Sequence, residues 1–413
     1  MKKITVFVLV LSLLLLNLVY AGAINMSVDD VESEEPLLCS ESEDCETEVT
    51  INAASEVQAQ IEISAKSAVL MEKSTGRVLY ALNENERLYP ASVTKIMTIL
   101  LVCEAIDEGK ISLTDTVSCS ENAASKGGSQ IWLEPGETMT VEELLKATCI
   151  YSANDACTLL GEYVGGSDTA FVALMNNRAK ELGMENTSFD NCTGLDDSTD
   201  THLTTAYDIA LMSRELLKHE YIKDYTTIWM DSLRDGETEL VNTNKLVRYY
   251  DGITGLKTGT TEKAGCCVSA TAQREGMELI AVVMGSENSN DRFNSARNLL
   301  DWGFANYEIT VPEIDEDSIR SVKVLHGKEQ NVNIVTPEAD PVLTNKGDGA
   351  NLTLSVELPE SVEAPVSENQ VLGKIIVYSG ETAVAEYELK AEKEIEQITF
   401  FSALYKILTS FTK

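Results

Sequence analysis

Three short stretches of the sequence carry residue types that could do chemistry together. The first is LYPASVTKIMT, residues 89–99, in which Ser92 and Lys95 are three positions apart. On a helix, positions i and i+3 share a face, so the Ser92 hydroxyl could approach the Lys95 amine. An amine whose pKa is lowered by burial or by a second cation can take the proton of such a hydroxyl. Taken alone, the pair is more typical of a helix cap followed by an exposed lysine, because S-x-x-K occurs often by chance.

The second stretch, YSANDA, holds a hydroxyl and an amide two positions apart, Ser152 and Asn154. At a turn into a helix, the Ser152 hydroxyl could shuttle a proton beside the Asn154 amide, which can donate hydrogen bonds. The plainer interpretation is helix capping, in which Ser152 and Asp155 satisfy free N–H groups of the first turn. Both interpretations place these side chains at the start of a helix.

The third stretch, GLKTGTTEKAG, combines a cation, a hydroxyl and a residue without a side chain in Lys257, Thr258 and Gly259. It leads into a β-rich run, where a glycine often marks a place at which another backbone or a ligand approaches closely. The plainer interpretation is a lysine in a turn. Each stretch has such an alternative, but all three in this order are hard to attribute to chance.

The elements that must position these side chains are predicted from hydrophobic periodicity and turn residues. Pro90 precedes a long apolar segment that ends near Gly109, which indicates a largely buried helix. Thr140 and Glu143 form the pattern of a capping box at the start of another helix. The remaining predicted elements are a β-hairpin over 65–86, a further helix within 138–166, a helix over 205–218, two β-runs over 265–285 and a helix over about 292–307.

The composition changes after Tyr307, where short β-rich runs alternate with turn residues. This pattern predicts a small all-β domain over 308–392. The final segment, 393–413, predicts an amphipathic helix suited to lie in a membrane surface, with packing on its own protein as the alternative. Its apolar face consists of Phe400, Phe401, Leu404, Ile407, Leu408 and Phe411.

The amino terminus has the layout of a secretory signal peptide over 1–23, with two lysines, an apolar run and small residues at Ala21 and Ala23. We therefore expect an exported protein. No cysteine follows the run closely, which argues against a lipoprotein anchor. An uncleaved signal anchor is the alternative, because the run is near the lower limit for spanning a bilayer. Residues 24–60 are acidic, contain no Lys or Arg, and predict a disordered spacer.

Charge and cysteine usage argue against several classes of protein. The formal net charge of −35 argues against nucleic acid as a partner and against a broadly cationic surface on anionic lipid. The nine cysteines form no CxxC pair and have no histidine at ligand spacing, so we expect neither a metal nor a cofactor, nor a disulfide scaffold. Cys103, Cys149 and Cys157 fall inside helical patterns and are expected to be small core residues.

The three stretches match, in order and spacing, the S-x-x-K, S-x-N and K-T-G motifs of penicillin-binding proteins and class A β-lactamases. Around them, LYPASVTKIMT, TAYDIALMSRELL, GITGLKTGTTEKAG and NLLDWGFANY resemble the exported D-alanyl-D-alanine carboxypeptidases, low-molecular-weight penicillin-binding proteins. The resemblance implies an α/β (α+β) catalytic domain of β-lactamase- or transpeptidase-like fold over 61–307, with an antiparallel sheet and a helical subdomain. That family commonly carries a small all-β domain and a terminal amphipathic helix as well. Alanine stands in SAND where many relatives have glycine, which should not matter for a backbone turn.

The resemblance also implies a function. The protein would remove the terminal D-alanine from peptidoglycan stem peptides ending in D-Ala-D-Ala, in cell-wall biogenesis and the control of cell shape, and β-lactams would acylate and inhibit it. It would act outside the cytoplasm, held at the outer face of the cytoplasmic membrane by the terminal helix. The resemblance implies that Ser92 is the nucleophile and Lys95 the general base. Ser152, Asn154 and Lys257 would relay protons and hold the peptide, and Thr258, Gly259 and Arg292 would bind the substrate and its carboxylate. The backbone N–H groups of Ser92 and Thr260 would form the oxyanion hole. For Arg292, a plain surface charge at a helix start is an equal alternative.

Three other functions compete with this one. A β-lactamase shares the motifs but usually deacylates with a glutamate, and the expected region, GMENTSFDNCTGLDD, lacks ExxLN and offers only Glu185 in unsuitable surroundings. A Ser-His-Asp hydrolase is disfavoured because GxSxG is absent, and His202 is expected to shape the rim of the site. A catalytically silent wall-binding or sensor protein is disfavoured because folding does not require Lys95, Asn154 and Lys257 together.

Overall fold

The computed structural model describes residues 61–196, 199–315 and 318–399. The predicted signal peptide, 1–23, and the predicted spacer, 24–60, lie outside the described residues. The predicted terminal helix, 393–413, lies outside them from residue 400 onward. In the part that is described, Ile395 forms an isolated β-bridge to Val366 and no helix is present, so a helix does not begin at residue 393.

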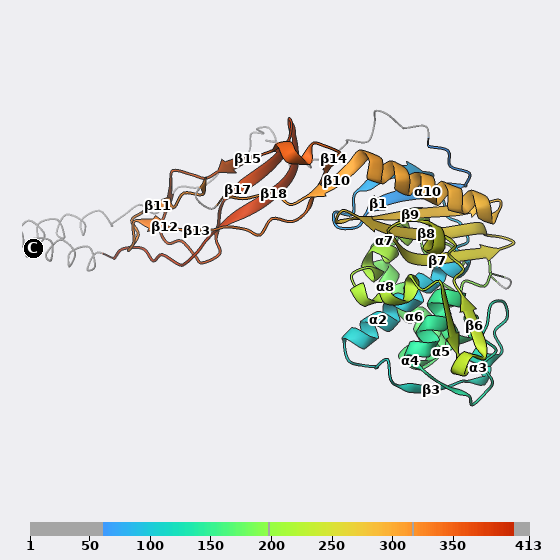
Figure 1. Ribbon diagram of the computed structural model, residues 1–413. Coiled ribbons are helices and arrows are strands. Elements are labelled where there is room, and N and C mark those ends of the chain that lie inside the picture. Colours follow the sequence, from blue (N-terminus) through green and yellow to red (C-terminus); the bar gives the residue numbers. More distant parts are fainter. Residues whose placement is uncertain (1–60, 197–198, 316–317, 400–413) are drawn as a thin grey trace, which may run out of the picture. The chain divides into compact units, whose positions relative to one another are not determined.

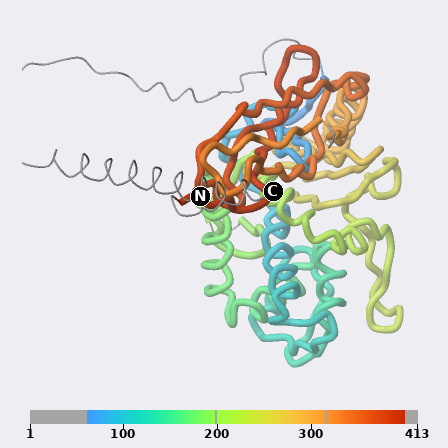
Figure 2. The backbone as a smooth tube through the Cα atoms, turned by 90° about the vertical axis from the view of Figure 1, so that its left-hand side faces the viewer, coloured from blue at the N-terminus to red at the C-terminus, as the bar shows by residue number. Residues whose placement is uncertain are grey.

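Five antiparallel strands form one sheet in the order β2-β1-β9-β8-β7 (Figure 1). Their bounds are β1 Ser67–Glu72, β2 Val78–Leu82, β7 Ile253–Thr261, β8 Gly265–Arg274 and β9 Met277–Ser286. Both predicted hairpins are confirmed, and β1 pairs with β9 with Ser67 opposite Met284. Figure 2 accordingly shows the blue beginning of the described chain beside the yellow and orange elements. The beginning and the end of the predicted catalytic domain thus meet in one sheet.

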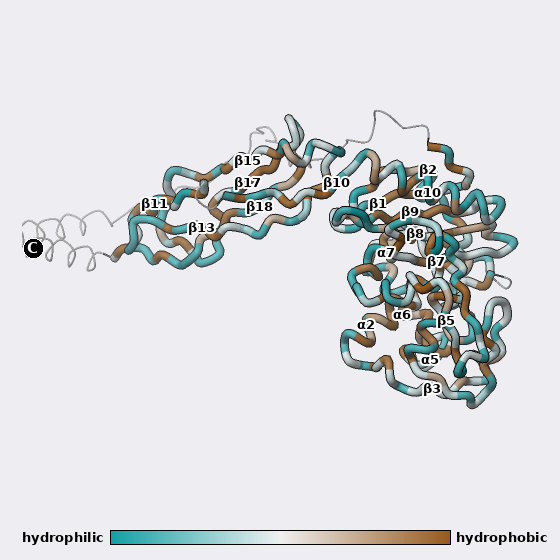
Figure 3. The backbone as a smooth tube through the Cα atoms, viewed as in Figure 1, coloured by the Kyte–Doolittle hydropathy of each residue, from teal (hydrophilic) through white to brown (hydrophobic). Residues whose placement is uncertain are grey.

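Apolar side chains alternate along the central strands, because successive residues of a strand point to opposite faces. In β9, Leu279, Ala281 and Val283 pack in one core with α10, Ser289–Asn306, whereas the residues between them pack with helices on the other face. The chain around β9 is coloured hydrophobic in Figure 3. The sheet is therefore buried on both faces, between α10 and a helical subdomain (Figure 1).

Helix α2, Lys95–Asp107, runs through the core of the helical subdomain, and nine of its 13 residues are buried. This confirms the predicted buried helix, and burial all round explains why its sequence is apolar on every side. The predicted capping box is also confirmed, because Thr140 and Glu143 exchange both of its hydrogen bonds at the start of α4, Val141–Lys146. Within the described residues, no helix combines the length and the apolar character needed to cross a membrane.

The other helices of this part are short and connect the motifs. They are α3 Glu121–Ala124, α4 Val141–Lys146, α5 Asn154–Gly165, α6 Asp168–Glu181, α7 Ala206–Leu216, α8 Lys223–Thr226 and α9 Leu246–Tyr249. Two small antiparallel hairpins accompany them, formed by β3 Thr116–Ser118 with β4 Thr138–Thr140 and by β5 Met230–Leu233 with β6 Thr238–Val241.

In the residues that the structure describes after α10, the chain forms strands and no α-helix, with only short 3₁₀ turns between them, which confirms the predicted all-β domain. The strands pair in three sheets of order β10-β14, β12-β11-β16 and β13-β18-β17-β15. Their bounds are β10 Tyr307–Thr310, β11 Val322–Leu325, β12 Asn331–Val332, β13 Ile334–Val335, β14 Val342–Asn345, β15 Leu352–Glu357, β16 Ser361–Glu363, β17 Val371–Ser379 and β18 Thr382–Ala391.

Candidate active site

Ser92 and Lys95 lie at the entry to α2, where the chain makes one 3₁₀ turn, Ala91–Thr94, before the α-helix begins. Lys95 has no exposed surface, and its Nζ lies 2.9 Å from Oγ of the half-buried Ser92. Neither helix is capped by the Ser92 side chain. The interpretation as a cap with an exposed lysine is therefore wrong, and the pair is in direct contact.

The Lys95 amine is surrounded by three oxygen atoms. Its Nζ lies 2.6 Å from Oδ1 of Asn154, 2.9 Å from the carbonyl oxygen of Thr193 and 2.9 Å from Oγ of Ser92. The Asn154 amide is fixed in this orientation because its Nδ2 donates to the carbonyl oxygen of Gly127, 2.6 Å away. The amide and carbonyl oxygens can only accept hydrogen bonds. A neutral amine has two N–H groups for them, which leaves its lone pair facing the Ser92 hydroxyl.

Burial favours that neutral form. It lowers the pKa of the Lys95 amine, against smaller opposing effects of the Cys157 and Cys192 thiols and the Asp155 carboxylate. Lys257 is 1% exposed, and its pKa lies well below the usual value because of burial and, next in size, because positive charges on Lys257 and Lys95 would repel each other. The surroundings of both lysines therefore favour an uncharged amine, the form that can accept a proton.

Ser152 lies in a break between two helices. After α4, residues Ala147–Tyr151 form a π-helical turn, and Ser152 then adopts the left-handed conformation with a φ of 66°. Its buried hydroxyl has no hydrogen-bond partner among the described residues. The capping interpretation is wrong for Ser152, because Ala153 is the N-cap of α5 and makes no side-chain cap bond. The Asp155 carboxylate does accept one N–H of the first turn, that of Ala156 at 2.9 Å, and it also accepts backbone N–H groups of another loop. A π-helical turn is frequent at functional sites, and no residue pattern in this stretch predicts it.

Lys257, Thr258 and Gly259 lie on the edge strand β7, so their interpretation as a turn is wrong. The Lys257 amine donates to the carbonyl oxygen of Thr258 at 3.1 Å. A Cβ added to Gly259 would lie 2.7 Å from the carbonyl oxygen of Pro90 and 2.8 Å from the nitrogen of Ser92. The expected close approach of another backbone at the glycine is therefore confirmed, and that backbone is the turn that carries Ser92.

Arg292, on α10, supports the same strand. It is 6% exposed, and its Nη1 donates to the carbonyl oxygen of Gly259 and to Oγ1 of Thr260, both at 3.0 Å, and to the carbonyl oxygen of Cys267 at 3.2 Å. The interpretation as a surface charge is therefore wrong. Its Nε is buried without a partner among the described residues. A direct role in binding a substrate carboxylate stays a prediction.

His202 does not lie on the rim as predicted, because it is fully buried behind the Ser92 turn. Its Nδ1 accepts from the backbone N–H of Asp190 at 3.0 Å, which leaves the proton of the neutral ring on Nε2. Nε2 lies 2.8 Å from Oγ1 of Thr94, which in turn donates to the carbonyl oxygen of Ala91 at 2.9 Å. Burial lowers the pKa of His202 to about 4. The histidine therefore holds the turn in place as a neutral ring.

This burial predicts a loss of stability in acid. Between pH 6.5 and about 4, the unfolded chain binds a proton at His202 that the folded chain does not, so the free energy of unfolding falls as pH falls. The contribution is about 3 kcal/mol across that window. Urea unfolding of the wild type and of His202→Gln should show that the substitution destabilises less at pH 4.5 than at pH 7.5. A difference that does not depend on pH would contradict the assignment of a buried neutral ring.

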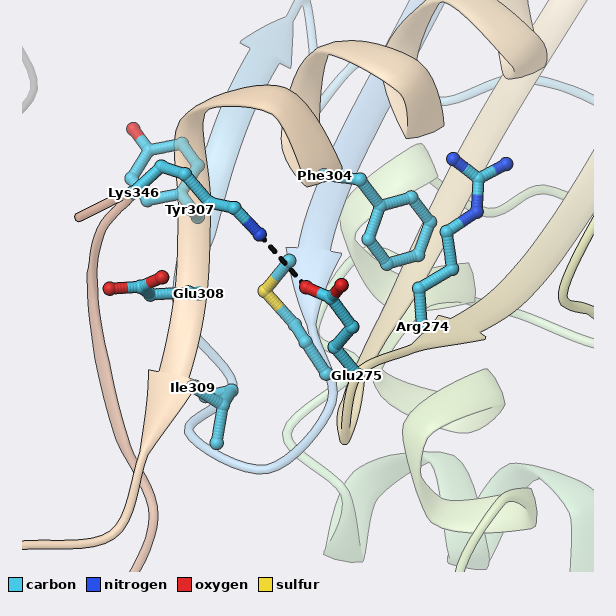
Figure 4. Close-up of a pocket in the computed structure, with 8 residues that line it drawn as sticks. Arg274, Glu275, Phe304, Tyr307, Glu308, Ile309 and Lys346 are labelled. Carbon is cyan, nitrogen blue, oxygen red and sulfur yellow. Dashed lines mark hydrogen bonds and ion pairs between the residues drawn. The ribbon is translucent and has the colours of Figure 1, made fainter. Parts of the chain in front are cut away.

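A cavity of about 360 Å³ lies at the other end of the sheet and is lined by none of these residues (Figure 4). Arg274, in its wall, is five positions along β8 from Ser269, the partner of Lys257, which corresponds to about 17 Å of strand. Glu275 and Lys346 form an ion pair across it at 3.0 Å. The reactive groups therefore gather elsewhere, where β7 meets the entry to α2.

Seven cysteines lie in the part of the chain that the structure describes, and all are free and buried. Cys103, Cys149 and Cys157 are core residues, as predicted, and no group of three or more Cys, His, Asp or Glu among the described residues is placed to hold a metal ion. Cys157 and Cys192 contact each other behind Lys95, with Sγ of Cys157 at 3.3 Å from the carbonyl oxygen of Cys192. Their thiols thus serve packing next to the site.

Two regions of the chain match models of known protein families. Residues 52–288 match the model of a peptidase family described as D-alanyl-D-alanine carboxypeptidase. Residues 313–397 match a model described as the C-terminal domain of penicillin-binding protein 5. The first match contains all three motifs, and the second lies within the all-β part.

Individual relatives agree with both matches. The D-alanyl-D-alanine carboxypeptidase DacF of Bacillus subtilis (strain 168) is 42% identical over 353 residues, which are 84% of this chain and 90% of that protein. Penicillin-binding protein 5 of Haemophilus influenzae superposes with a TM-score of 0.73 at 29% identity, over 81% of this chain and 98% of that one. Penicillin-binding protein D2 of Listeria monocytogenes, solved in its ampicillin-bound form, has a TM-score of 0.55 at 31% identity, over 60% of this chain and 100% of that one.

Proposed function

The chain belongs to the D-alanyl-D-alanine carboxypeptidase family, and from this premise we propose that it works through an acyl-enzyme on Ser92. It is a serine peptidase, a hydrolase that removes the terminal D-alanine from stem peptides of peptidoglycan. The observation that carries the proposal is the position of the Lys95 amine. Two N–H groups of the neutral amine donate to Asn154 and Thr193. The lone pair of Nζ then faces the Ser92 hydroxyl, whose oxygen lies 2.9 Å from Nζ.

Acylation begins when the proton of Ser92 Oγ passes to the lone pair of Lys95 and Oγ attacks the carbonyl carbon of the penultimate D-alanine. The carbonyl oxygen becomes an oxyanion that accepts from the backbone N–H groups of Ser92 and Thr260, donors that are each worth about 10² to 10³ in kcat in other hydrolases. As the C–N bond breaks, the proton reaches the leaving amine through the Ser152 hydroxyl. Free D-alanine departs, and the rest of the peptide stays as an ester on Ser92.

The same groups then release the peptide. A water molecule gives a proton to the neutral Lys95 amine and attacks the ester carbonyl, and the oxyanion forms again between the N–H groups of Ser92 and Thr260. When the ester bond breaks, the proton returns to Ser92 Oγ. The enzyme is thereby restored, and the shortened peptide leaves with a new carboxylate.

The β7 strand binds the end of the substrate. Lys257 and the Thr258 hydroxyl meet the terminal carboxylate, and Arg292 contributes positive charge from behind the strand, where it bonds Gly259 and Thr260. Gly259 has no side chain to separate the strand from the Ser92 turn, which a Cβ would meet at 2.8 Å. The strand therefore lies directly against the turn that carries the nucleophile.

The β-lactamase alternative has less support. β-Lactams acylate Ser92 by the same route, but fast hydrolysis of the product needs a base for water on the ester. Glu185 is the glutamate in the region where a β-lactamase would carry this base, and its side chain is exposed. The group of this region that contacts Lys95 is the backbone carbonyl of Thr193. Slow release of the penicilloyl group follows, and β-lactams act as inhibitors.

We further propose that the protein acts outside the cytoplasm, at the outer face of the cytoplasmic membrane. The apolar run of the predicted signal peptide, 1–23, and the apolar face of the segment 393–413 support this location. The domain boundaries proposed with it are 61–307 for the catalytic part and 308–392 for the all-β part.

The function is tested by comparing two substrates. We expect the protein to release D-alanine from diacetyl-L-Lys-D-Ala-D-Ala with a kcat of about 1 to 10 s⁻¹, as is typical of enzymes. With benzylpenicillin, we expect a stoichiometric covalent adduct in intact-mass spectra and slow release of penicilloate. Fast penicilloate release without D-alanine release would instead identify a β-lactamase. Reaction with neither substrate would indicate a silent relative.

A further inference from the structure

A groove of about 450 Å³ lies next to the active site, between the end of α3 and the loop that follows it. Helix α3 contributes Glu121 and Ala124 to its lining, and the loop, residues 125–135, contributes the other lining residues. The groove is lined by Glu121, Ala124, Ser125, Gln130, Trp132, Leu133, Glu134 and Pro135.

The middle of this loop is attached to Asn154, a member of the proposed catalytic group. The carbonyl oxygen of Gly127 accepts from the Asn154 side chain, and that of Ser129 accepts from its backbone N–H, both at 2.6 Å. Gln130, the next residue, already lines the groove. Consecutive Cα atoms are about 3.8 Å apart, and Gln130 is one residue from Ser129, which bonds Asn154. The groove therefore begins within about 10 Å of Asn154, a distance that about three residues of extended peptide can span.

Trp132 is presented to solvent from a fixed backbone. Its side chain is 74% exposed, and its φ is 59°, which is uncommon for a bulky residue. The N–H groups of Ile131 and Leu133, on either side, donate to the buried Asp155 carboxylate at 3.1 and 3.0 Å. Nη1 of Arg234 donates to the carbonyl oxygen of Ile131 at 2.9 Å. The indole is therefore held out from the surface, although burial elsewhere would gain hydrophobic free energy.

The groove carries negative charge without a cation to neutralise it. Glu121 and Glu134 are exposed, and neither forms an ion pair within the described part of the chain. No lysine or arginine is among the residues that line it. Lys126, the nearest lysine along the loop, is paired with Asp168 at 3.0 Å. An aromatic face with two unpaired carboxylates is a site for a cation, because ammonium groups bind both.

We propose that this groove binds the side-chain ammonium of the diamino acid that precedes D-Ala-D-Ala in the stem peptide. The inference rests on the proposed function and extends it to a substrate class, peptides whose diamino acid keeps a free amine. With the scissile bond at Ser92, the preceding residue is the next one along the peptide, within the reach of an extended chain. The ammonium lies on the face of Trp132 and between the carboxylates of Glu121 and Glu134.

The test compares two peptides that differ in one charge, Nα-acetyl-L-Lys-D-Ala-D-Ala and its Nα,Nε-diacetyl form. For the wild type, we expect a kcat/KM of D-alanine release about tenfold higher for the free amine, in line with cation–π and carboxylate contacts at an exposed site. Trp132→Ala and Glu134→Gln should each bring this ratio towards one, while the diacetyl peptide and benzylpenicillin react at nearly the wild-type rate.

Glu108→Gln is the matched control, because this exposed carboxylate lies at the far end of α2, about 20 Å of helix from Lys95. It should leave the ratio unchanged. Equal kcat/KM values for the two peptides in the wild type, or an unchanged ratio in both groove variants, would overturn the ammonium site and leave the carboxypeptidase intact. Release of D-alanine from neither peptide would overturn the proposed function and the site with it.

Discussion

Ser92→Ala should abolish D-alanine release, with kcat reduced by at least about 10⁴, and should prevent any covalent adduct with benzylpenicillin. The reason is that the hydroxyl oxygen at 2.9 Å from Lys95 Nζ is the atom that forms the ester, and alanine has no atom in its place. The two assays are D-alanine release with a D-amino acid oxidase readout and intact-mass detection of the penicilloyl adduct.

The variant should remain folded. The Ser92 side chain is only half-buried, and Lys95 keeps its bonds to Asn154 and Thr193 when the hydroxyl is removed. We therefore expect a melting temperature close to that of the wild type. Ser112→Ala, in the exposed loop after α2, controls for loss of a serine hydroxyl and should leave both reactions unchanged. An adduct on a well-folded Ser92→Ala protein would show that another residue is the nucleophile.

Lys95→Gln should lower the rate of acylation by about 10² to 10⁴, the usual contribution of a general base. Glutamine can still donate to the oxygens of Asn154 and Thr193, but its amide nitrogen has no basic lone pair to offer Ser92. The variant thus separates the structural role of the side chain from its role as a base. Stopped-flow labelling with a fluorescent penicillin measures the acylation rate directly.

The pH dependence of that rate gives a second readout. Burial lowers the pKa of Lys95, so the amine is neutral above this lowered value and becomes protonated as pH falls through it. Acylation of the wild type should accordingly fall on the acid side, and Lys95→Gln should lack this limb. Lys110→Gln, at an exposed lysine beyond the end of α2, should behave like the wild type. The same acid limb in Lys95→Gln would assign the titration to another group.

Much of the site could be predicted from the sequence because its members are close along the chain. Ser92 and Lys95 are three positions apart, and any helical conformation brings such side chains onto one face. The buried helix, the two β-hairpins and the capping box of Thr140 and Glu143 were predicted for the same reason. Each depends on residues within one or two turns, or on alternating burial within single strands.

Other features depend on contacts between distant parts of the chain, which no local pattern specifies. The orientation of the Lys95 amine is decided by Asn154 and Thr193, 59 and 98 positions away. From the sequence, we expected His202 at the rim of the site, and a surface position was an equal alternative for Arg292. Folding instead buried His202 behind the nucleophile and placed Arg292 against β7, because their partners belong to other elements.

The sequence alone thus determined which residues react, since their types and spacing define the three motifs. Tertiary structure alone decided their protonation and their mutual fit. A lysine becomes a base through burial and through the acceptors around it, and both are set by helices and strands that pack from across the chain. The same packing brings Gly259 against the Ser92 turn, where a side chain would clash with the backbone.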